Sequence, residues 1–242
     1  MRKTLAYIFA VVLSFYLLVS YWWGDSKAHS REYAGLRVEV KDSARARYLS
    51  ALELKTYIEK RISMRKGEPV ITISTDSIET ILSENRLISR VNCYATPSGL
   101  IRVDIWQRIP ILRVMDGEKS YFIDETGIII PGPMPVAVHV PVATGNISQE
   151  FACTELYDFA RFLQKNKFWH AQIAQIYITD KHEVEIIPRV GEHRIVMGDL
   201  GNYEEKLNNL RCFYDQALSR CGWNKYHTIN LKYKDQIVAT RK

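Results

Sequence analysis

The residues in this sequence that could carry out chemistry are histidines, cysteines and paired carboxylates. The run His182-Glu183-Val184-Glu185 places a histidine beside two acids, but no second histidine follows four residues later, as a helical zinc motif requires. The run also alternates like a strand. It therefore predicts the solvated end of a hairpin rather than a metal site, and we expect no bound cofactor.

The four cysteines do not form a recognisable redox or metal motif. Cys93, Cys153, Cys212 and Cys221 contain no C-x-x-C pair. Cys212 and Cys221 lie nine residues apart, at and beyond the end of an expected helix, which is too far for a disulfide if the helix continues. Free thiols are the interpretation that these spacings favour.

The adjacent carboxylates Asp124 and Glu125 lie in the run Tyr-Phe-Ile-Asp-Glu-Thr-Gly, which predicts a strand entering a turn. In such a turn an aspartate bonds to nearby backbone rather than to a substrate. The sequence also lacks a G-x-S-x-G motif, a P-loop and a Rossmann glycine pattern. We therefore expect no catalytic residues and no small-molecule substrate, and predict that the protein is not an enzyme.

Composition excludes further classes of protein. The chain has 242 residues, 47 % of them hydrophobic and 25 % charged, which is enough apolar surface to fold. Its net charge is +6, and the cationic clusters at residues 45–47 and 60–66 carry no interleaved stacking aromatics. The sequence thus gives no reason to expect a nucleic-acid partner.

Residues 5–23 form an apolar run whose only polar residues are Ser14 and Ser20. As a helix this run would cross a bilayer of roughly 30 Å. We expect a single transmembrane anchor preceded by a cytoplasmic tail at residues 1–4 and followed by a tether at residues 24–35, with the remaining chain outside the cytoplasm. A cleaved signal peptide is the alternative, but the run exceeds a signal core and ends in Trp22 and Trp23.

Residues 36–110 are expected to form a first domain with the order β-α-α-β-β. Residues 36–40, 90–95 and 100–106 have the pattern of strands, and apolar residues recur at helical spacing in residues 51–62 and 78–82. Pro97-Ser98-Gly99 predicts the turn between the last two strands.

Residues 111–242 are expected to form a second domain, a mixed but mainly antiparallel β-sheet with helices. Strand patterns follow one another without regular crossover helices. Helical faces are expected at residues 156–163 and 203–217, and final strands at 229–233 and 236–240. The predicted fold class is therefore α+β.

This order of anchor, first domain and β-rich second domain resembles the FtsQ/DivIB family of bacterial cell-division proteins, whose first domain is a POTRA domain. Gln107-Arg108-Ile109-Pro110 stands where the family has E-R-x-P, and residues 121–127 match its strand ending in D-x-x-G. Ile229-Asn230-Leu231-Lys232-Tyr233 matches the family's vDLRY strand. Gln107, Asn230 and Lys232 depart from the usual Glu, Asp and Arg, and residues 43–52 are longer than the usual first turn.

The resemblance implies a non-enzymatic scaffold of the divisome, anchored in the cytoplasmic membrane at the septum. Family members bind FtsB and FtsL and help to couple divisome assembly to septal peptidoglycan synthesis, and their POTRA domain is implicated in recruitment. The alternative is a POTRA-containing component of outer-membrane protein assembly or secretion, although no run of amphipathic barrel strands follows here.

The family binds its partner at the C-terminal edge of its second domain. By alternation, residues 229–233 would place Ile229, Leu231 and Tyr233 on one face of a strand, with Lys232 on the other. Tyr233 matches the family's partner-contacting tyrosine; alternatively it packs on the sheet. The expected partner-binding residues are Ile229, Leu231, Lys232, Tyr233, Gln236 and Ile237.

Overall fold

The structure is a computed structural model that describes residue 9 and residues 11–20, 31–117 and 119–242. Residues 11–20 are helical, and among the described residues no helix is both long and apolar enough to cross a membrane. The expected tail lies outside the described residues, as do residues 5–8, 10 and 21–23 of the expected anchor and 24–30 of the expected tether. The chain divides into two compact units after Gln107.

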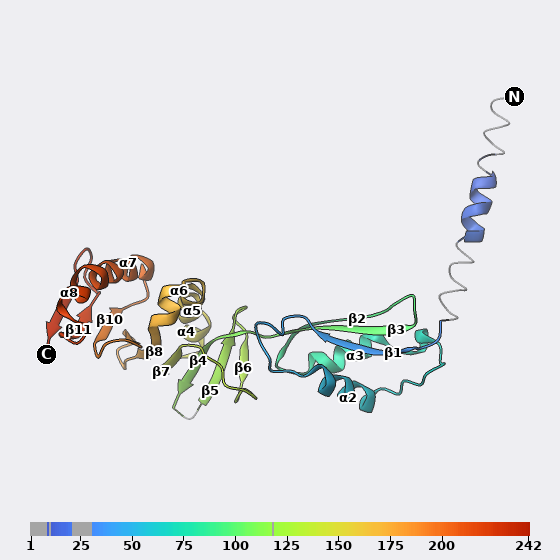
Figure 1. Cartoon of the computed structure of the whole chain (residues 1–242), viewed down its shortest axis with the longest axis horizontal. Helices are drawn as coiled ribbons and strands as arrows, with labels where there is room; N and C mark the ends of the chain where they lie inside the picture. Colours follow the sequence, from blue (N-terminus) through green and yellow to red (C-terminus); the bar gives the residue numbers. More distant parts are fainter. Residues whose placement is uncertain (1–8, 10, 21–30, 118) are drawn as a thin grey trace. The chain divides into compact units, whose positions relative to one another are not determined.

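Unit 1 has the β-α-α-β-β order that the sequence predicts (Figure 1). Its described strands form one sheet in the order β1-β3-β2, in which β1 is parallel and β2 antiparallel to β3. Its elements are β1 (Gly35–Val40), α2 (Ala51–Arg61), the 3₁₀ turn η1 (Val70–Thr72), α3 (Thr75–Ser83), β2 (Ile88–Ala95) and β3 (Leu100–Gln107).

The core of unit 1 lies between the two helices and one face of the sheet. Ile58 of α2 and Leu82 of α3 are almost fully buried there, against the inward residues of β3. Tyr33 also lies in this core at 6 % exposure, and Glu32 bridges to Pro69. The last residues of the expected tether therefore belong to the folded unit, because Tyr33 supplies apolar surface that the small core buries.

Unit 2 is a larger mixed sheet with helices. Its described strands have the order β12-β11-β10-β9-β8-β7-β4-β5-β6. The first of its elements are β4 (Pro110–Asp116), β5 (Lys119–Asp124), β6 (Ile129–Pro131), β7 (Val142–Gly145), α4 (Gln149–Cys153), α5 (Glu155–Lys165), α6 (Lys167–Gln172) and β8 (Ile173–Ile178). The others are β9 (Val184–Pro188), β10 (Arg194–Gly198), α7 (Tyr203–Phe213), the π-helical turn η2 (Tyr214–Leu218), α8 (Ser219–Cys221), β11 (Tyr226–Asn230) and β12 (Val238–Arg241).

The α+β class is confirmed, and the sheet of unit 2 is mixed. The pairings β4–β7, β7–β8 and β10–β11 are parallel, whereas the other described pairings of this sheet are antiparallel. Helices α5 and α7 bury their apolar faces on the sheet through Phe159, Leu163, Leu207 and Leu210. This packing fixes α7 over the strands that precede the C-terminus.

A buried histidine lies at the start of β10. His193 is 2 % exposed, and its Nε2 lies 2.8 Å from the hydroxyl of Tyr214 in η2. The ring of Trp223 stacks on it, with centroids 6.5 Å apart. Burial lowers the pKa of His193 below its usual value, partly opposed by the backbone of Trp223. His193 is therefore neutral in the folded protein near pH 7.

We expect the free energy of unfolding of unit 2 to fall as the solution is acidified below about pH 6.5, the ordinary pKa of histidine. The pKa of His193 is lower in the folded protein than in the unfolded chain, so the unfolded chain binds a proton at a higher pH. The contribution of neutral His193 to the free energy of unfolding is therefore fully present above the pKa of the unfolded chain, and it is lost as the pH falls toward the pKa of the folded protein. Urea titrations at several pH values measure the slope. His193→Gln keeps an acceptor for Tyr214 and should reduce the slope; an equal slope in this variant would assign the effect to other groups.

Candidate functional site

The C-terminal edge of unit 2 consists of β11, the loop of residues 231–237 and β12. Strand β11 ends at Asn230, three residues before the predicted end of the strand. The side-chain Oδ1 of Asn230 accepts a hydrogen bond from the backbone N–H of Lys232 at 2.9 Å, and Asp235 has a positive φ of 60°. These two turn features end the strand, so the expected alternation through Tyr233 is wrong beyond Leu231.

The six expected partner-binding residues therefore separate into two groups. Ile229 is 0 % exposed and Leu231 3 % exposed, so both side chains pack in the core rather than stand at the surface. Lys232, Tyr233 and Gln236 are exposed on the loop, and Ile237 is half-buried against the core. Tyr233 is 52 % exposed, which is large for an aromatic side chain and does not fit packing on the sheet.

Strand β12 is the last strand of the described sheet on this side. It pairs with β11 in antiparallel register, Asn230 opposite Val238 and Thr228 opposite Thr240. Its other side pairs with no described strand, and Val238 is 44 % exposed. The strand begins at Val238 rather than at Gln236, because the loop takes up the residues before it.

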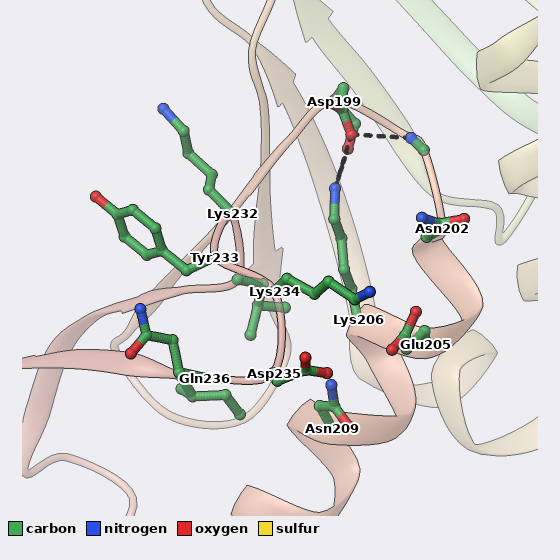
Figure 2. Close-up of a pocket in the computed structure, with 13 residues that line it drawn as sticks. Asp199, Asn202, Glu205, Lys206, Asn209, Lys232, Tyr233, Lys234, Asp235 and Gln236 are labelled. Carbon is green, nitrogen blue, oxygen red and sulfur yellow. Dashed lines mark hydrogen bonds and ion pairs between the residues drawn. The ribbon is translucent and has the colours of Figure 1, made fainter.

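A groove of about 270 Å³ lies between this loop and the first turns of α7 (Figure 2). One wall is the loop, and the other consists of residues that follow β10 or lie on α7. The residues lining the groove are Asp199, Gly201, Asn202, Glu205, Lys206, Asn209, Leu231, Lys232, Tyr233, Lys234, Asp235, Gln236 and Ile237.

Lys206 holds the α7 wall of the groove in place. Its Nζ donates to the carboxylate of Asp199 at 2.8 Å and to the carbonyl oxygens of Met197 and Asp199 at 3.1 and 3.0 Å. The hydrogen bond from Lys206 lowers the pKa of Asp199 below its usual value, with a further contribution from the backbone N–H of Gly201. The ammonium group of Lys206 thus finds its hydrogen-bond acceptors within this chain, and its role is structural.

The groove residues on α7 and before it were not expected from the sequence. The helical face of residues 203–217 was predicted, but nothing local indicates which loop lies beside its first turn. That neighbour follows from the parallel pairing of β10 with β11, in which Ile195 lies opposite Ile229. The pairing brings the chain after β10 next to the chain after β11.

The other residues considered for chemistry have structural positions. Asp124 is 1 % exposed; its Oδ1 accepts from the backbone N–H groups of Thr126 and Ile128, as the predicted turn requires. His182 is exposed in the turn between β8 and β9, as the interpretation as a hairpin end predicted. Across the part of the chain that the structure describes, no group of three or more His, Cys, Asp or Glu could hold a metal ion.

The cysteines whose side chains are described are Cys93, Cys153 and Cys212, and all three are free thiols. Cys93 is buried beneath α3, where burial and the nearby carboxylates of Glu79 and Asp76 raise its pKa to about 12. It is therefore a protonated core residue rather than a reactive thiolate.

Two family models match the chain. A model described as FtsQ/DivIB, C-terminal related, matches residues 109–240, which is more than half of the sequence. The chain belongs to the FtsQ/DivIB family. A model described as a POTRA-like domain matches residues 34–106, within unit 1. A search of curated proteins found no match.

Membership of FtsQ/DivIB places the chain in a family of non-enzymatic cell-division scaffolds. The matched C-terminal region contains the whole groove, strand β11 and all of β12 except Arg241. The exposed loop and open edge strand suit a protein that works by binding other proteins, because an unpaired strand edge offers backbone donors and acceptors in a row.

Proposed function

We propose that this FtsQ/DivIB protein is a membrane-anchored divisome scaffold that binds FtsB- and FtsL-type partners at the septum and links divisome assembly to septal peptidoglycan synthesis. We place the anchor at residues 5–23, on the apolar run of the sequence. The observation that carries the proposal is that the outer edge of β12 pairs with no described strand, while the loop that leads into β12 carries the exposed Tyr233.

Two other edge strands, β2 of unit 1 and β6 of unit 2, are less open than β12. On β2, the backbone N–H of Cys93 donates to the carboxylate of Glu79 at 2.6 Å, so a side chain of α3 already occupies this edge donor. Strand β6 has three residues and ends in Pro131, which has no N–H to donate. Within the sheet of unit 2, an incoming strand therefore finds its clearest row of backbone groups on β12.

The edge of β12 cannot supply the whole affinity. The strand has four residues and offers only a few backbone hydrogen bonds, each worth about 1 kcal/mol in water. A partner strand that continues past Val238 reaches the loop of residues 231–237, where Tyr233 offers a large aromatic surface with a polar tip. We infer that Tyr233 provides most of the side-chain binding energy, with Gln236 and Ile237 beside it.

Tyr233→Ala is expected to weaken binding of the source cell's FtsB-type protein about 30-fold, which corresponds to ~2 kcal/mol for the loss of an aromatic anchor. The measurement is a titration of the solubilised full chain with that protein. The control is Tyr177→Ala, which removes a tyrosine that is 39 % exposed on the inner strand β8. A folded Tyr233 variant with unchanged affinity would refute the assignment.

Depletion of the protein in cells tests its wider role. Filamentous cells are expected if it serves the divisome. Normal division with a disturbed content of outer-membrane proteins would favour the alternative, a POTRA-containing component of outer-membrane assembly.

A further inference from the structure

Lys232 stands next to Tyr233 in the loop, but its own contacts lie within the chain. Its Nζ donates to the carboxylate of Glu183 at 2.5 Å, and its backbone N–H donates to Asn230 at 2.9 Å. The hydrogen bond with Glu183 raises the pKa of Lys232, so the ammonium group stays charged throughout the physiological range.

The methylene groups of the Lys232 side chain pass over Gly198 of the neighbouring strand β10. Gly198, at the end of β10, has a φ of +74°, and a Cβ atom built on it would lie 2.8 Å from Cγ of Lys232. Gly198 pairs with Val184 of β9, and Glu183 immediately precedes Val184. The side chain of Lys232 thus reaches across the end of β10 to the turn before β9.

These contacts attach the start of the loop to the sheet. Figure 2 shows Lys232 and Tyr233 projecting from the loop away from Lys206, so both lie on the same side of it. Loss of the contact between Lys232 and Glu183 would leave the loop held there by the Asn230 turn and by the bond of Leu231 N–H to the carbonyl of Val196 at 2.8 Å.

We infer that Lys232 is a positioning residue, whose ion pair with Glu183 across Gly198 fixes the direction in which the loop presents Tyr233. This inference rests on the proposed function, because it assigns the partner contact to Tyr233. It changes the expectation for Lys232, which the sequence indicated as a residue that contacts the partner itself.

The test is Glu183→Gln in the full chain, which removes the carboxylate charge at nearly constant size and leaves Lys232 and Tyr233 in place. Hydrogen–deuterium exchange of residues 231–237 should become faster at low salt. Affinity for the FtsB-type protein should fall about threefold, the size expected from an exposed ion pair. In 1 M salt the difference between variant and parent should nearly vanish, because screening already weakens the pair in the parent.

Two further variants complete the experiment. Asp180→Asn changes the net charge equally in the same β8–β9 turn, where Asp180 is exposed, and should alter neither exchange nor affinity. The exchanged pair, Glu183→Lys with Lys232→Glu, should restore both readouts toward the parent values, since it rebuilds the ion pair with reversed sign.

The outcomes separate the two proposals. Unchanged exchange in Glu183→Gln at low salt overturns the positioning role. The double variant could regain slow exchange without regaining affinity, while Tyr233→Ala still weakens binding. This result would show that Lys232 contacts the partner itself. It would overturn the positioning role and leave the proposed function standing. Unchanged affinity in Tyr233→Ala refutes the proposed function instead, and the exchange rates then still decide whether Glu183 holds the loop.

Discussion

Replacing Asp124 by alanine is expected to lower the free energy of unfolding of unit 2 by about 3–5 kcal/mol, the cost of removing one partner of a buried ion pair. The carboxylate is 1 % exposed, and its Oδ2 accepts from a guanidinium nitrogen of Arg108 at 2.8 Å. Its Oδ1 accepts from the hydroxyl of Thr126 at 2.7 Å, as well as from two backbone N–H groups. The substitution leaves Arg108, at 19 % exposure, with an uncompensated charge and opens the β5–β6 turn.

Urea unfolding of the full chain, followed by a signal from unit 2, measures the effect. Trp169 and Trp223 both lie in unit 2 and provide a fluorescence probe. Asp180→Ala removes an exposed carboxylate of the same unit and should change stability by less than about 0.5 kcal/mol. A loss of under about 1 kcal/mol for Asp124→Ala would mean that water reaches Arg108 and replaces the pair.

Gln107→Glu is expected to destabilise unit 1 by about 3 kcal/mol near pH 7, although glutamate is the usual residue of the family motif at this place. Gln107 is 3 % exposed. Its Oε1 accepts from the backbone N–H groups of Tyr48 and Leu49 at 2.9 and 3.0 Å, and its Nε2 donates to the carbonyl of Ala46 at 2.8 Å and to the carboxylate of Asp42 at 3.2 Å. A carboxylate keeps the acceptor and loses the donor, and it adds a second negative charge beside Asp42.

The destabilisation should depend on pH in a defined direction. Burial and the negative charge of Asp42 raise the pKa of the introduced carboxyl group above its unfolded value, so the deficit is largest near neutral pH and shrinks as the pH falls. Thermal unfolding at pH 5 and pH 7.5 measures this difference. Lys66→Gln, which shifts the net charge by the same amount at an exposed position, should show no such deficit.

A second variant distinguishes electrostatics from shape. Asp42→Asn in the Gln107→Glu background supplies a new N–H donor to the introduced carboxylate, so it should recover part of the lost stability. Equal instability of the single and double variants would contradict the role given to Asp42. The segment that Gln107 holds is the stretch of Ala46, Tyr48 and Leu49 between β1 and α2, so both variants test how this connection is fixed to the end of β3.

Local sequence patterns were sufficient for the elements of unit 1 and for several of unit 2, but they did not indicate β7, α4 or α6. Alternation and helical spacing predicted the β-α-α-β-β order of unit 1 and the helix at residues 203–217, because each pattern describes one face buried on a neighbour. Asp124 was likewise predictable as a turn residue, since its backbone bonds reach only four residues along the chain. Its pairing with Arg108 was not predicted, because the residues between them had to fold into β4 and β5 first.

The candidate site was predictable only in part. Tyr233 was expected at the C-terminal edge, but the alternating pattern of residues 229–233 does not show that the strand stops at Asn230, where the side chain of Asn230 turns the chain.

The sequence by itself determined the mixed α+β class and the β-α-α-β-β order of unit 1, and it indicated Tyr233 as a candidate for contact with a partner. The tertiary structure decided that Ile229 and Leu231 are core, that the first turn of α7 forms the second wall of the groove, and that Lys232 pairs with Glu183. The physical reason is the order of strands in the sheet. The parallel pairing of β10 with β11 and the antiparallel pairing of β9 with β10 join segments tens of residues apart, and local periodicity carries no information about such pairings.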